Sequence, residues 1–440
     1  MSAVNQTTAY STELAIPLFK SVSICFCLDG KQRDQRIVTT YPNIQGDFIP
    51  EFGGVADAFA QNFETRGEVG ASLCIYRHGQ CVADLWGGKA DAEKDINWSE
   101  DTVSIVYSCT KAMTALCAHL LIDRGELNLH APVGDYWPEY ACNGKEKTTV
   151  AMFLNHTAGM ASLTSPVKDG GLTDWDYTVE LMAKDPPWWT PGTRNGYHML
   201  TFGWTVGELV RRVSGMSLGE FFRKELAEPL GADFWIGLPE AIDKRVAPVL
   251  AYKPAPGETL PPFTRVMLSE PESLQAACMK NNGRLNFNKA STHRAQIGGA
   301  GGISNARGMA KVFAALSPSH PDEMFSPARV SAMGNVSAAT MEDATLLIPT
   351  RFGQGFMCSM DNRHVRGGQD CSFIIGRNAF GHVGMGGSCV FFDPEADLVF
   401  AYSMNKMGGG ILLNDRGQSL IDATYETLGY SGNPAGFWTP

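Results

Sequence analysis

Serine and lysine stand three residues apart at Ser108–Lys111 and at Ser165–Lys168. A serine hydroxyl is a weak nucleophile at neutral pH and needs a base within hydrogen-bonding distance. Residues i and i+3 share one face of a helix, so this spacing at a helix start places an amine beside the hydroxyl. The helix N-terminus also favours negative charge that develops there. The pattern therefore indicates a nucleophile and its base.

The surroundings of the two pairs differ. Ser108 opens the segment 108–124, in which apolar residues recur at helical spacing and which Gly125 terminates. The second pair contains Pro166 and lies in a glycine-rich loop. We therefore expect chemistry at Ser108. The alternative is a serine that only caps the helix, with an exposed lysine in the first turn.

The elements that would position Ser108 follow one another as strands, then helices, then strands and a final helix. Residues 70–88 predict a β-hairpin that turns at His78-Gly79, and a second hairpin is predicted from residues 389–392 and 398–402. Helices are predicted at 149–155, at 203–213, after the capping-box pair Ser217 and Glu220, at 306–316 and at 411–428. The segments 160–195 and 250–295 predict irregular, loop-rich structure.

This order predicts an α/β (α+β) fold in which one antiparallel sheet flanked by helices is split by an inserted helical lobe. With 440 residues the chain is too long for one ordinary core. We expect an N-terminal extension at 1–40, a sheet domain made of 41–106 and 293–440, and a mainly helical lobe at 107–292. The active site would lie at the interface of the two.

Six short motifs occur in an order that resembles the serine β-lactamase-like, or penicillin-binding-protein, superfamily, and most closely its family VIII carboxylesterases. They are Asp84-Leu85-Trp86-Gly87-Gly88, Ser108-Cys109-Thr110-Lys111, Leu154-Asn155-His156-Thr157-Ala158-Gly159-Met160, Pro191-Gly192-Thr193-Arg194-Asn195-Gly196-Tyr197-His198, Ala300-Gly301-Gly302-Ile303-Ser304 and Gly381-His382-Val383-Gly384-Met385-Gly386-Gly387-Ser388. The resemblance runs from about residue 45 to 430 and implies the serine β-lactamase/DD-peptidase-like fold.

The resemblance implies catalytic roles for three residues. Ser108 would attack an acyl carbonyl and form a covalent acyl-enzyme. Lys111 would accept the proton of Ser108, for which it must be neutral at some stage. Tyr197 would pass a proton to the leaving group and later activate water, and a lysine ammonium nearby would favour its phenolate. The oxyanion hole would consist of the backbone N–H groups of Ser108 and Met385.

The chain departs from the β-lactamase pattern at two of these motifs. His382-Val383-Gly384 stands where β-lactamases carry Lys-Thr-Gly, and Met199 stands where they carry an asparagine. A neutral histidine and a valine would hold the carboxylate of a β-lactam weakly. The resemblance therefore implies uncharged esters as substrates, with His382, Val383 and Gly384 in the substrate site.

Other residues near these motifs receive weaker predictions. His198 and Trp189 are expected to contact substrate, and loops 160–195 and 250–295 to shape the pocket. Trp175, Trp188 and Trp189 could wall an apolar acyl pocket, although packing within the lobe is the simpler interpretation. His156 is expected to fix a turn.

Composition restricts the partners and the compartment. The net charge of -10 and the lack of a basic stripe argue against nucleic acid. The eleven cysteines and nine histidines show no metal-ligand spacing, so we expect no metal and no cofactor. No segment predicts a membrane span or a clear signal peptide, so we expect a cytoplasmic protein with a small-molecule ester substrate. No pattern in the sequence indicates an oligomeric state.

Two alternatives remain open at this stage. The same residues could act on a β-lactam, a D-amino-acid peptide or another amide, or transfer an acyl group to an alcohol. A protein of another class, a non-catalytic binding or scaffold protein on this fold, would be expected to lack at least one of Ser108, Lys111 and Tyr197.

Overall fold

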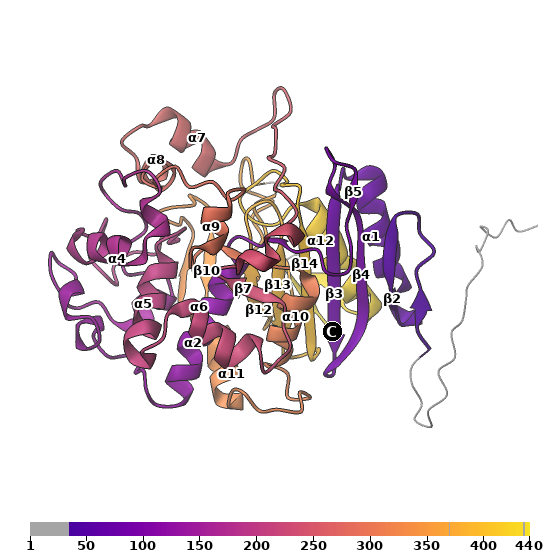
Figure 1. Cartoon of the computed structure of the whole chain (residues 1–440), viewed down its shortest axis with the longest axis horizontal. Helices are drawn as coiled ribbons and strands as arrows, with labels where there is room; N and C mark the ends of the chain where they lie inside the picture. Colours follow the sequence, from indigo (N-terminus) through magenta and orange to yellow (C-terminus); the bar gives the residue numbers. More distant parts are fainter. Residues whose placement is uncertain (1–34, 369, 434–435) are drawn as a thin grey trace, which may run out of the picture.

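The computed structural model describes residues 35–368, 370–433 and 436–440 (Figure 1). Most of the predicted extension at 1–40 thus lies outside the described residues. Its described end belongs to the body of the protein, because strand β1 (Ile37–Val38) pairs antiparallel with β2 (Ile44–Phe48) at one edge of the main sheet. The sheet therefore begins at Ile37 rather than at residue 41.

The main sheet is antiparallel and has the order β1-β2-β4-β3-β14-β13-β12-β11-β10-β9, with β5 paired to β4. Its other strands are β3 (Gly70–Arg77), β4 (Gln80–Asp91), β5 (Ile96–Asn97), β9 (Ala338–Thr340), β10 (Thr350–Phe352), β11 (Met357–Cys358), β12 (Phe380–Val383), β13 (Cys389–Asp393) and β14 (Leu398–Met404). Both predicted hairpins, β3–β4 and β13–β14, are confirmed. Strands β3 and β14 pair with each other, so the two ends of the chain build one sheet, as predicted.

Both faces of this sheet are buried. Along β13 the side chains alternate, so that Phe391 packs in the core under α1 (Gly53–Thr65) and α12 (Asp415–Thr427), whereas Val390 and Phe392 pack in the core on the opposite face. Helix α10 (Ala306–Ala314) covers that second face and contacts β3, β13 and β14. The sheet is consequently a layer between helices (Figure 1).

The remaining helices lie mostly in the lobe on the left of Figure 1. They are α2 (Cys109–Asp123), α3 (Val150–Leu154), α4 (Trp175–Lys184), α5 (Phe202–Ser214), α6 (Leu218–Phe222), α7 (Pro262–Ser269), α8 (Leu274–Lys280), α9 (Ala290–Arg294) and α11 (Pro327–Gly334). Short 3-10 helices are η1 (Pro50–Phe52), η2 (Val133–Asp135), η3 (Pro138–Tyr140), η4 (Gly171–Thr173) and η6 (Glu240–Arg245), and η5 (Arg223–Ala227) is a π-helix. Small sheets are formed by β6 (Ser104–Ile105), β8 (Gly302–Ser304) and β7 (Phe234–Ile236), and by β15 (Ser431–Asn433) and β16 (Phe437–Thr439).

Most predicted helices are confirmed, including the capping box of Ser217 and Glu220 at α6. The prediction of irregular structure was wrong in two places, because 160–195 contains α4 and 250–295 contains α7, α8 and α9. Helix α4 is capped by Asp174, whose side chain accepts the N–H of Tyr177, and it packs against α5. Tertiary packing of one face stabilises such short helices more than local propensity does.

Helix α2 is the central helix of the lobe. Every residue from Cys109 to Leu121 is buried, so the helix has no solvent-exposed face along that stretch. It packs against α5 and α6 in the lobe and against β12 of the sheet. Its first residues therefore lie at the junction of lobe and sheet.

Within the described residues, no helix is both long enough and apolar enough to cross a lipid bilayer.

Candidate active site

Ser108 lies where the segment after β6 passes into α2. The preceding residue, Tyr107, has a left-handed φ of 45°, a conformation that costs a non-glycine residue free energy and is concentrated at functional sites. Ser108 occupies the N-cap position, but its side chain makes no capping hydrogen bond. The interpretation of Ser108 as a simple helix cap is therefore wrong, and its hydroxyl is available for chemistry.

Lys111 is fully buried, and its Nζ lies 3.1 Å from Oγ of Ser108. The same nitrogen donates to the carbonyl oxygens of Met199 at 2.5 Å and Gly299 at 2.7 Å. Burial lowers the pKa of this amine well below its usual range, because removal from water disfavours the charged form. The predicted contact between hydroxyl and amine is thus present, with the amine in a setting that favours its neutral form.

The three contacts of Lys111 match the hydrogen-bonding groups of a neutral amine. In the neutral amine two N–H groups satisfy the carbonyls of Met199 and Gly299, which leaves the lone pair to accept the hydroxyl proton of Ser108; in the ammonium the third N–H donates to Oγ of Ser108. The second pair differs at every point, because the side chain of Lys168 is 57% exposed and lies 3.9 Å from Asp174. Only the first pair has the geometry of a nucleophile and its base.

Tyr197 is buried beside this pair. Its ring centroid is 4.8 Å from Nζ of Lys111, and Phe352 stacks on the ring at 5.9 Å. The hydroxyl makes no hydrogen bond of regular geometry within the described chain, yet Ser108 is near enough to lower the pKa of the phenol as a hydrogen-bonding neighbour. The two hydroxyls are therefore adjacent rather than hydrogen-bonded to each other.

The expected phenolate is wrong for the resting site. Burial raises the pKa of Tyr197, and this effect exceeds the lowering by Ser108. The lowered pKa of Lys111 and the raised pKa of Tyr197 favour a neutral amine and a protonated phenol in the resting site. One group is ready to accept a proton and the other to donate one.

Asp343 holds Tyr197 in place, a contact that no pattern in the sequence indicates. Both carboxylate oxygens accept the backbone N–H of Tyr197, at 3.0 and 3.1 Å. The carboxylate also accepts the N–H groups of Thr345 and Leu346 and the hydroxyl of Thr350. Asp343 is fully buried, and its pKa is raised by burial against these donors. Four donors to one carboxylate fix the loop that carries the phenol.

Three buried histidines surround the phenol. Burial lowers the pKa of His198 to about 4 and that of His382 to about 3, and it lowers the pKa of His156 well below the usual value. All three rings are therefore neutral at physiological pH. His156, with a left-handed φ of 65°, accepts the N–H of His198, so it fixes a turn, as predicted. These neutral rings add no positive charge that would oppose proton transfer to Lys111.

The segment carrying Met385 lies alongside the segment leading to Ser108. A Cβ atom at Gly384 would lie 2.4 Å from the carbonyl oxygen of Val106 and 2.2 Å from Oγ of Ser388, so only glycine permits this approach. Of the described residues, neither Ser108 nor Met385 donates its backbone N–H to a carbonyl oxygen. Both donors are thus available, and their use as an oxyanion hole stays a prediction.

The residues predicted to contact substrate differ in what they can offer. His382 donates from Nδ1 to the carbonyl of Val383 at 2.8 Å, which leaves Nε2 as an acceptor, buried and without a partner among the residues that the structure describes. His198 donates from Nδ1 to Gly196 and accepts the N–H of Met160 at Nε2, so both of its nitrogens are occupied. It therefore supports the site through the backbone and has no polar atom free for a ligand.

The tryptophans of loop 160–195 mainly pack within the lobe. Trp175 donates to Glu208 and lies against Trp204, and Trp188 donates to the carbonyl of Ser162. Trp189 donates to the carbonyl of Thr157 and approaches His198 edge-on, with centroids 6.0 Å apart. Of the three, Trp189 alone contacts a residue beside the phenol, and its contact with substrate stays a prediction.

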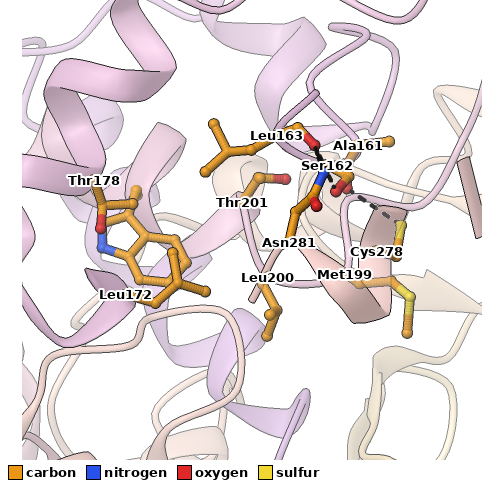
Figure 2. Close-up of a pocket in the computed structure, with 11 residues that line it drawn as sticks. Ala161, Ser162, Leu163, Leu172, Thr178, Met199, Leu200, Thr201, Cys278 and Asn281 are labelled. Carbon is orange, nitrogen blue, oxygen red and sulfur yellow. Dashed lines mark hydrogen bonds between the residues drawn. The ribbon is translucent and has the colours of Figure 1, made fainter. Parts of the chain in front are cut away.

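A small cavity lies behind the site, between loop 160–195 and the 250–295 segment (Figure 2). Met199, whose carbonyl binds Lys111, lines it together with Ala161 and Cys278, and Cys278 donates to the carbonyl of Ala161 at 3.8 Å. Its volume of about 20 Å³ has room for one water molecule. It can accommodate solvent next to the base but not an acyl group.

Comparisons with known proteins agree with this geometry. The beta-lactamase family model matches residues 55–421. The esterase/beta-lactamase LipL of Mycobacterium tuberculosis is 32% identical over 373 residues, which cover 83% of this chain and 84% of that protein. A solved family VIII carboxylesterase has a TM-score of 0.75 and 36% identity over 87% of this chain and 99% of its own. A penicillin-binding protein homologue from Caulobacter crescentus has a TM-score of 0.78 and 32% identity, covering 88% and 100%.

The chain therefore belongs to the beta-lactamase family. Its fold is that of beta-lactamases and penicillin-binding proteins, and it is a serine hydrolase of this type.

Proposed function

We propose that this chain hydrolyses small, uncharged carboxylic esters through a covalent acyl-enzyme on Ser108. The observation that carries the proposal is the 3.1 Å contact between Oγ of Ser108 and the buried Nζ of Lys111. The esterase in the name of LipL and the carboxylesterase of known structure support an ester as the substrate.

Acylation uses the resting protonation states. Oγ of Ser108 attacks the acyl carbon while its proton moves to Nζ of Lys111, and the carbonyl oxygen becomes an oxyanion near the N–H groups of Ser108 and Met385. The tetrahedral intermediate then expels the alkoxide, which takes a proton from Tyr197. The products of this half are an alcohol, an acyl-serine, an ammonium and a phenolate.

Deacylation returns both protons. The phenolate of Tyr197 removes a proton from water, and the hydroxide attacks the acyl carbon. When that intermediate collapses to the carboxylic acid, the ammonium of Lys111 gives its proton back to Oγ of Ser108. The two charges form next to each other, with Nζ 4.8 Å from the phenol ring centroid, so each stabilises the other in a buried site.

An uncharged ester fits the site better than a β-lactam. His382 is neutral at physiological pH because its pKa is lowered to about 3, and Val383 has no hydroxyl. The carboxylate of a β-lactam would therefore lack a cation and a hydroxyl at the position where β-lactamases provide both. We expect slow turnover of β-lactams at most.

The test compares p-nitrophenyl acetate, p-nitrophenyl butyrate and nitrocefin as substrates. We expect activity on both esters, little on nitrocefin, and complete loss on both esters in Ser108→Ala. Ser165→Ala is the matched control, because it removes the serine of another Ser-x-x-Lys pair, and it should retain full activity. A fluorophosphonate probe should shift the mass of the peptide that contains Ser108.

Equal turnover by the parent and Ser108→Ala would reject the nucleophile. Faster turnover of nitrocefin than of either ester would keep the nucleophile and replace the ester with a β-lactam.

A further inference from the structure

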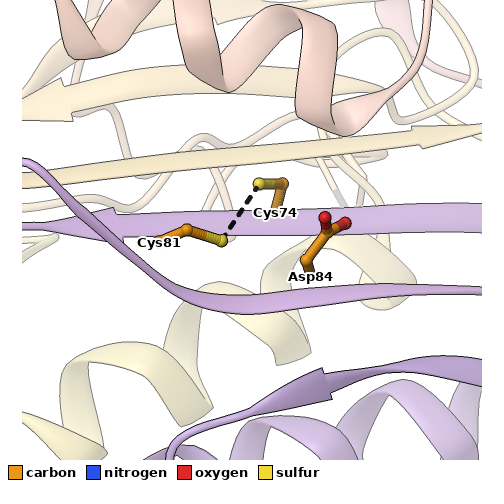
Figure 3. Close-up of side chains that lie close together, drawn as sticks. All are labelled: Cys74, Cys81 and Asp84. Atoms are coloured by element: carbon orange, nitrogen blue, oxygen red, sulfur yellow. Dashed lines mark hydrogen bonds between the residues drawn. The ribbon is translucent and has the colours of Figure 1, made fainter. Parts of the chain in front are cut away.

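Two cysteines and an aspartate come together on the β3–β4 hairpin (Figure 3). The Sγ atoms of Cys74 and Cys81 are 4.0 Å apart. These two sulfurs and a carboxylate oxygen of Asp84 all lie within 4.8 Å of one another. Thiolate sulfur and carboxylate oxygen are both ligands of zinc-like cations, so the group has a ligand set as well as proximity.

A β-bulge creates this arrangement. Cys74 is paired with Asp84 across the hairpin, but the register shifts between Ile75 and Tyr76, so that Tyr76 is paired with Cys81. In a regular strand Cys81 and Asp84, three residues apart, would point to opposite faces. The extra residue in β4 places both on the face that carries Cys74. Bulges of this kind re-aim side chains and are often found at functional sites.

Asp84 is oriented by a partner on helix α10. Nε of Arg307 donates to Oδ2 of Asp84 at 2.5 Å, and another guanidinium nitrogen of Arg307 contacts Glu100 at 3.1 Å. This leaves the second oxygen of Asp84 for another ligand. Carboxylates that bind metal ions are commonly held by such hydrogen bonds from a second layer of residues.

We propose that Cys74, Cys81 and Asp84 bind a thiophilic divalent cation such as Zn²⁺ or Cd²⁺. A tetrahedral site with zinc–sulfur bonds of about 2.3 Å separates its two sulfurs by about 3.8 Å, close to the 4.0 Å found here. Binding replaces the two thiol protons, which are released to solvent. Two thiolates and one carboxylate then balance the cation together with the guanidinium of Arg307.

The exposure of the three residues gives the cation a route in. Cys74 is fully buried, whereas Cys81 and Asp84 are partly exposed, so a cation approaches from their side and keeps a water as its fourth ligand. The bound ion would tie the hairpin to the start of α10 through Asp84 and Arg307. Its effect is on stability, since a cation that binds only the folded chain raises the free energy of unfolding.

The experiment titrates the full-length, fully reduced protein with Cd²⁺ and follows the ultraviolet charge-transfer absorption of cadmium–thiolate bonds. We expect one equivalent of Cd²⁺ per chain, a rise in Tm, the release of two protons and tighter binding as pH increases. Cys81→Ser should abolish this stoichiometric step. Cys142→Ser is the matched control, because Cys142 is another partly exposed thiol without a second cysteine beside it, and it should bind as the parent does.

A second measurement needs no variant. Zn²⁺ should protect Cys81 of the parent from alkylation while Cys142 in the same sample still reacts, as read from peptide masses. The proposal is overturned if Cys81→Ser binds Cd²⁺ like the parent, or if Zn²⁺ fails to protect Cys81. Air oxidation of Cys74 and Cys81 to a disulfide that Zn²⁺ does not prevent would also overturn it.

Discussion

Two buried lysines of this protein have nearly the same surroundings and different chemistry. Lys111 lies 4.8 Å from the ring centroid of Tyr197, and Lys145 lies 4.9 Å from that of Tyr140. Each donates to backbone carbonyls, and burial lowers the pKa of each. Even a hydroxyl residue is matched, since Thr148 acts on the pKa of Tyr140 as Ser108 acts on that of Tyr197.

The difference is the third partner of the amine. Nζ of Lys145 donates to the carbonyls of Met182, Ala183 and Asp185, and three acceptors require the three N–H groups of an ammonium. The carboxylates of Asp185 and Glu146 also favour its charged form. Lys111 has two carbonyls and one hydroxyl, and a hydroxyl can donate. Burial alone therefore does not make a lysine a base; one partner must carry a proton to give.

Among these variants, the largest loss of kcat/KM should follow the replacement of Lys111, whereas the replacement of Lys145 should leave kcat/KM unchanged. Lys111→Ala should lower kcat/KM by about 10³-fold, in the range of a lost general base. Lys145→Ala should leave three carbonyls without donors and lower the free energy of unfolding by about 1–3 kcal/mol, with kcat/KM per folded molecule unchanged. Ester kinetics and thermal unfolding followed by circular dichroism measure both quantities. Similar activity losses in the two variants would contradict the comparison.

Replacing Tyr197 should lower the reaction rate by less than replacing Lys111 does, and replacing Tyr140 should leave the rate unchanged. Tyr197→Phe should lower kcat by about 100-fold, because the leaving alkoxide and the attacking water both lose their proton partner. An alkyl ester is the suitable substrate, since its alkoxide needs protonation. Tyr140→Phe is the matched control and should keep normal kcat. A normal rate for Tyr197→Phe would remove the phenol from the reaction.

The pH profile should report the neutral amine. Lys111 accepts a proton only when unprotonated, so kcat/KM should fall about tenfold for each pH unit below its pKa. Because burial lowers that pKa, the fall should begin well below the ordinary lysine value of about 10.4. Tyr197 must be protonated, and its raised pKa should move any loss of activity in base above the ordinary tyrosine range of about 10. An acid limb centred near the ordinary lysine value would mean that Lys111 rests as an ammonium.

The smallest loss of kcat should follow the replacement of Asp343, the residue that holds Tyr197 in place. Asp343→Asn should lower kcat by about tenfold at nearly unchanged KM, because a misplaced Tyr197 loses alignment rather than chemistry. Asp393→Asn is the control, since Asp393 is also a buried carboxylate but binds the hydroxyl of Tyr425. Both variants should be less stable, and only the first should be slower per folded molecule. Equal kcat values for Asp343→Asn and Asp393→Asn would show that Asp343 contributes to stability alone.

Sequence reasoning succeeded where the signal is local. Ser108 and Lys111 are three residues apart, so helix geometry alone brings them together, and the β3–β4 turn at His78-Gly79 is likewise a property of neighbouring residues. The order of the motifs along the chain also predicted the role of Tyr197 and the fold. Each of these predictions needed only short segments of the chain.

It failed where the cause lies far away in the chain. Asp343 is 146 residues from Tyr197, and no pattern near either residue indicates their contact. Helix α4 buries only one face against α5, so the prolines and glycines around it hid a helix that tertiary packing stabilises. The bulge that turns Cys81 toward Asp84 is also invisible in composition. Long-range packing decided the first two, whereas the bulge is a feature of the pairing between β3 and β4.

The complete burial of helix α2 restricts how this enzyme can be altered. Because each side chain from Cys109 to Leu121 touches protein on all sides, random replacement there will mostly yield insoluble chains. Laboratory evolution toward new esters should therefore leave this helix untouched and diversify residues 160–195, which we expect to shape the substrate pocket.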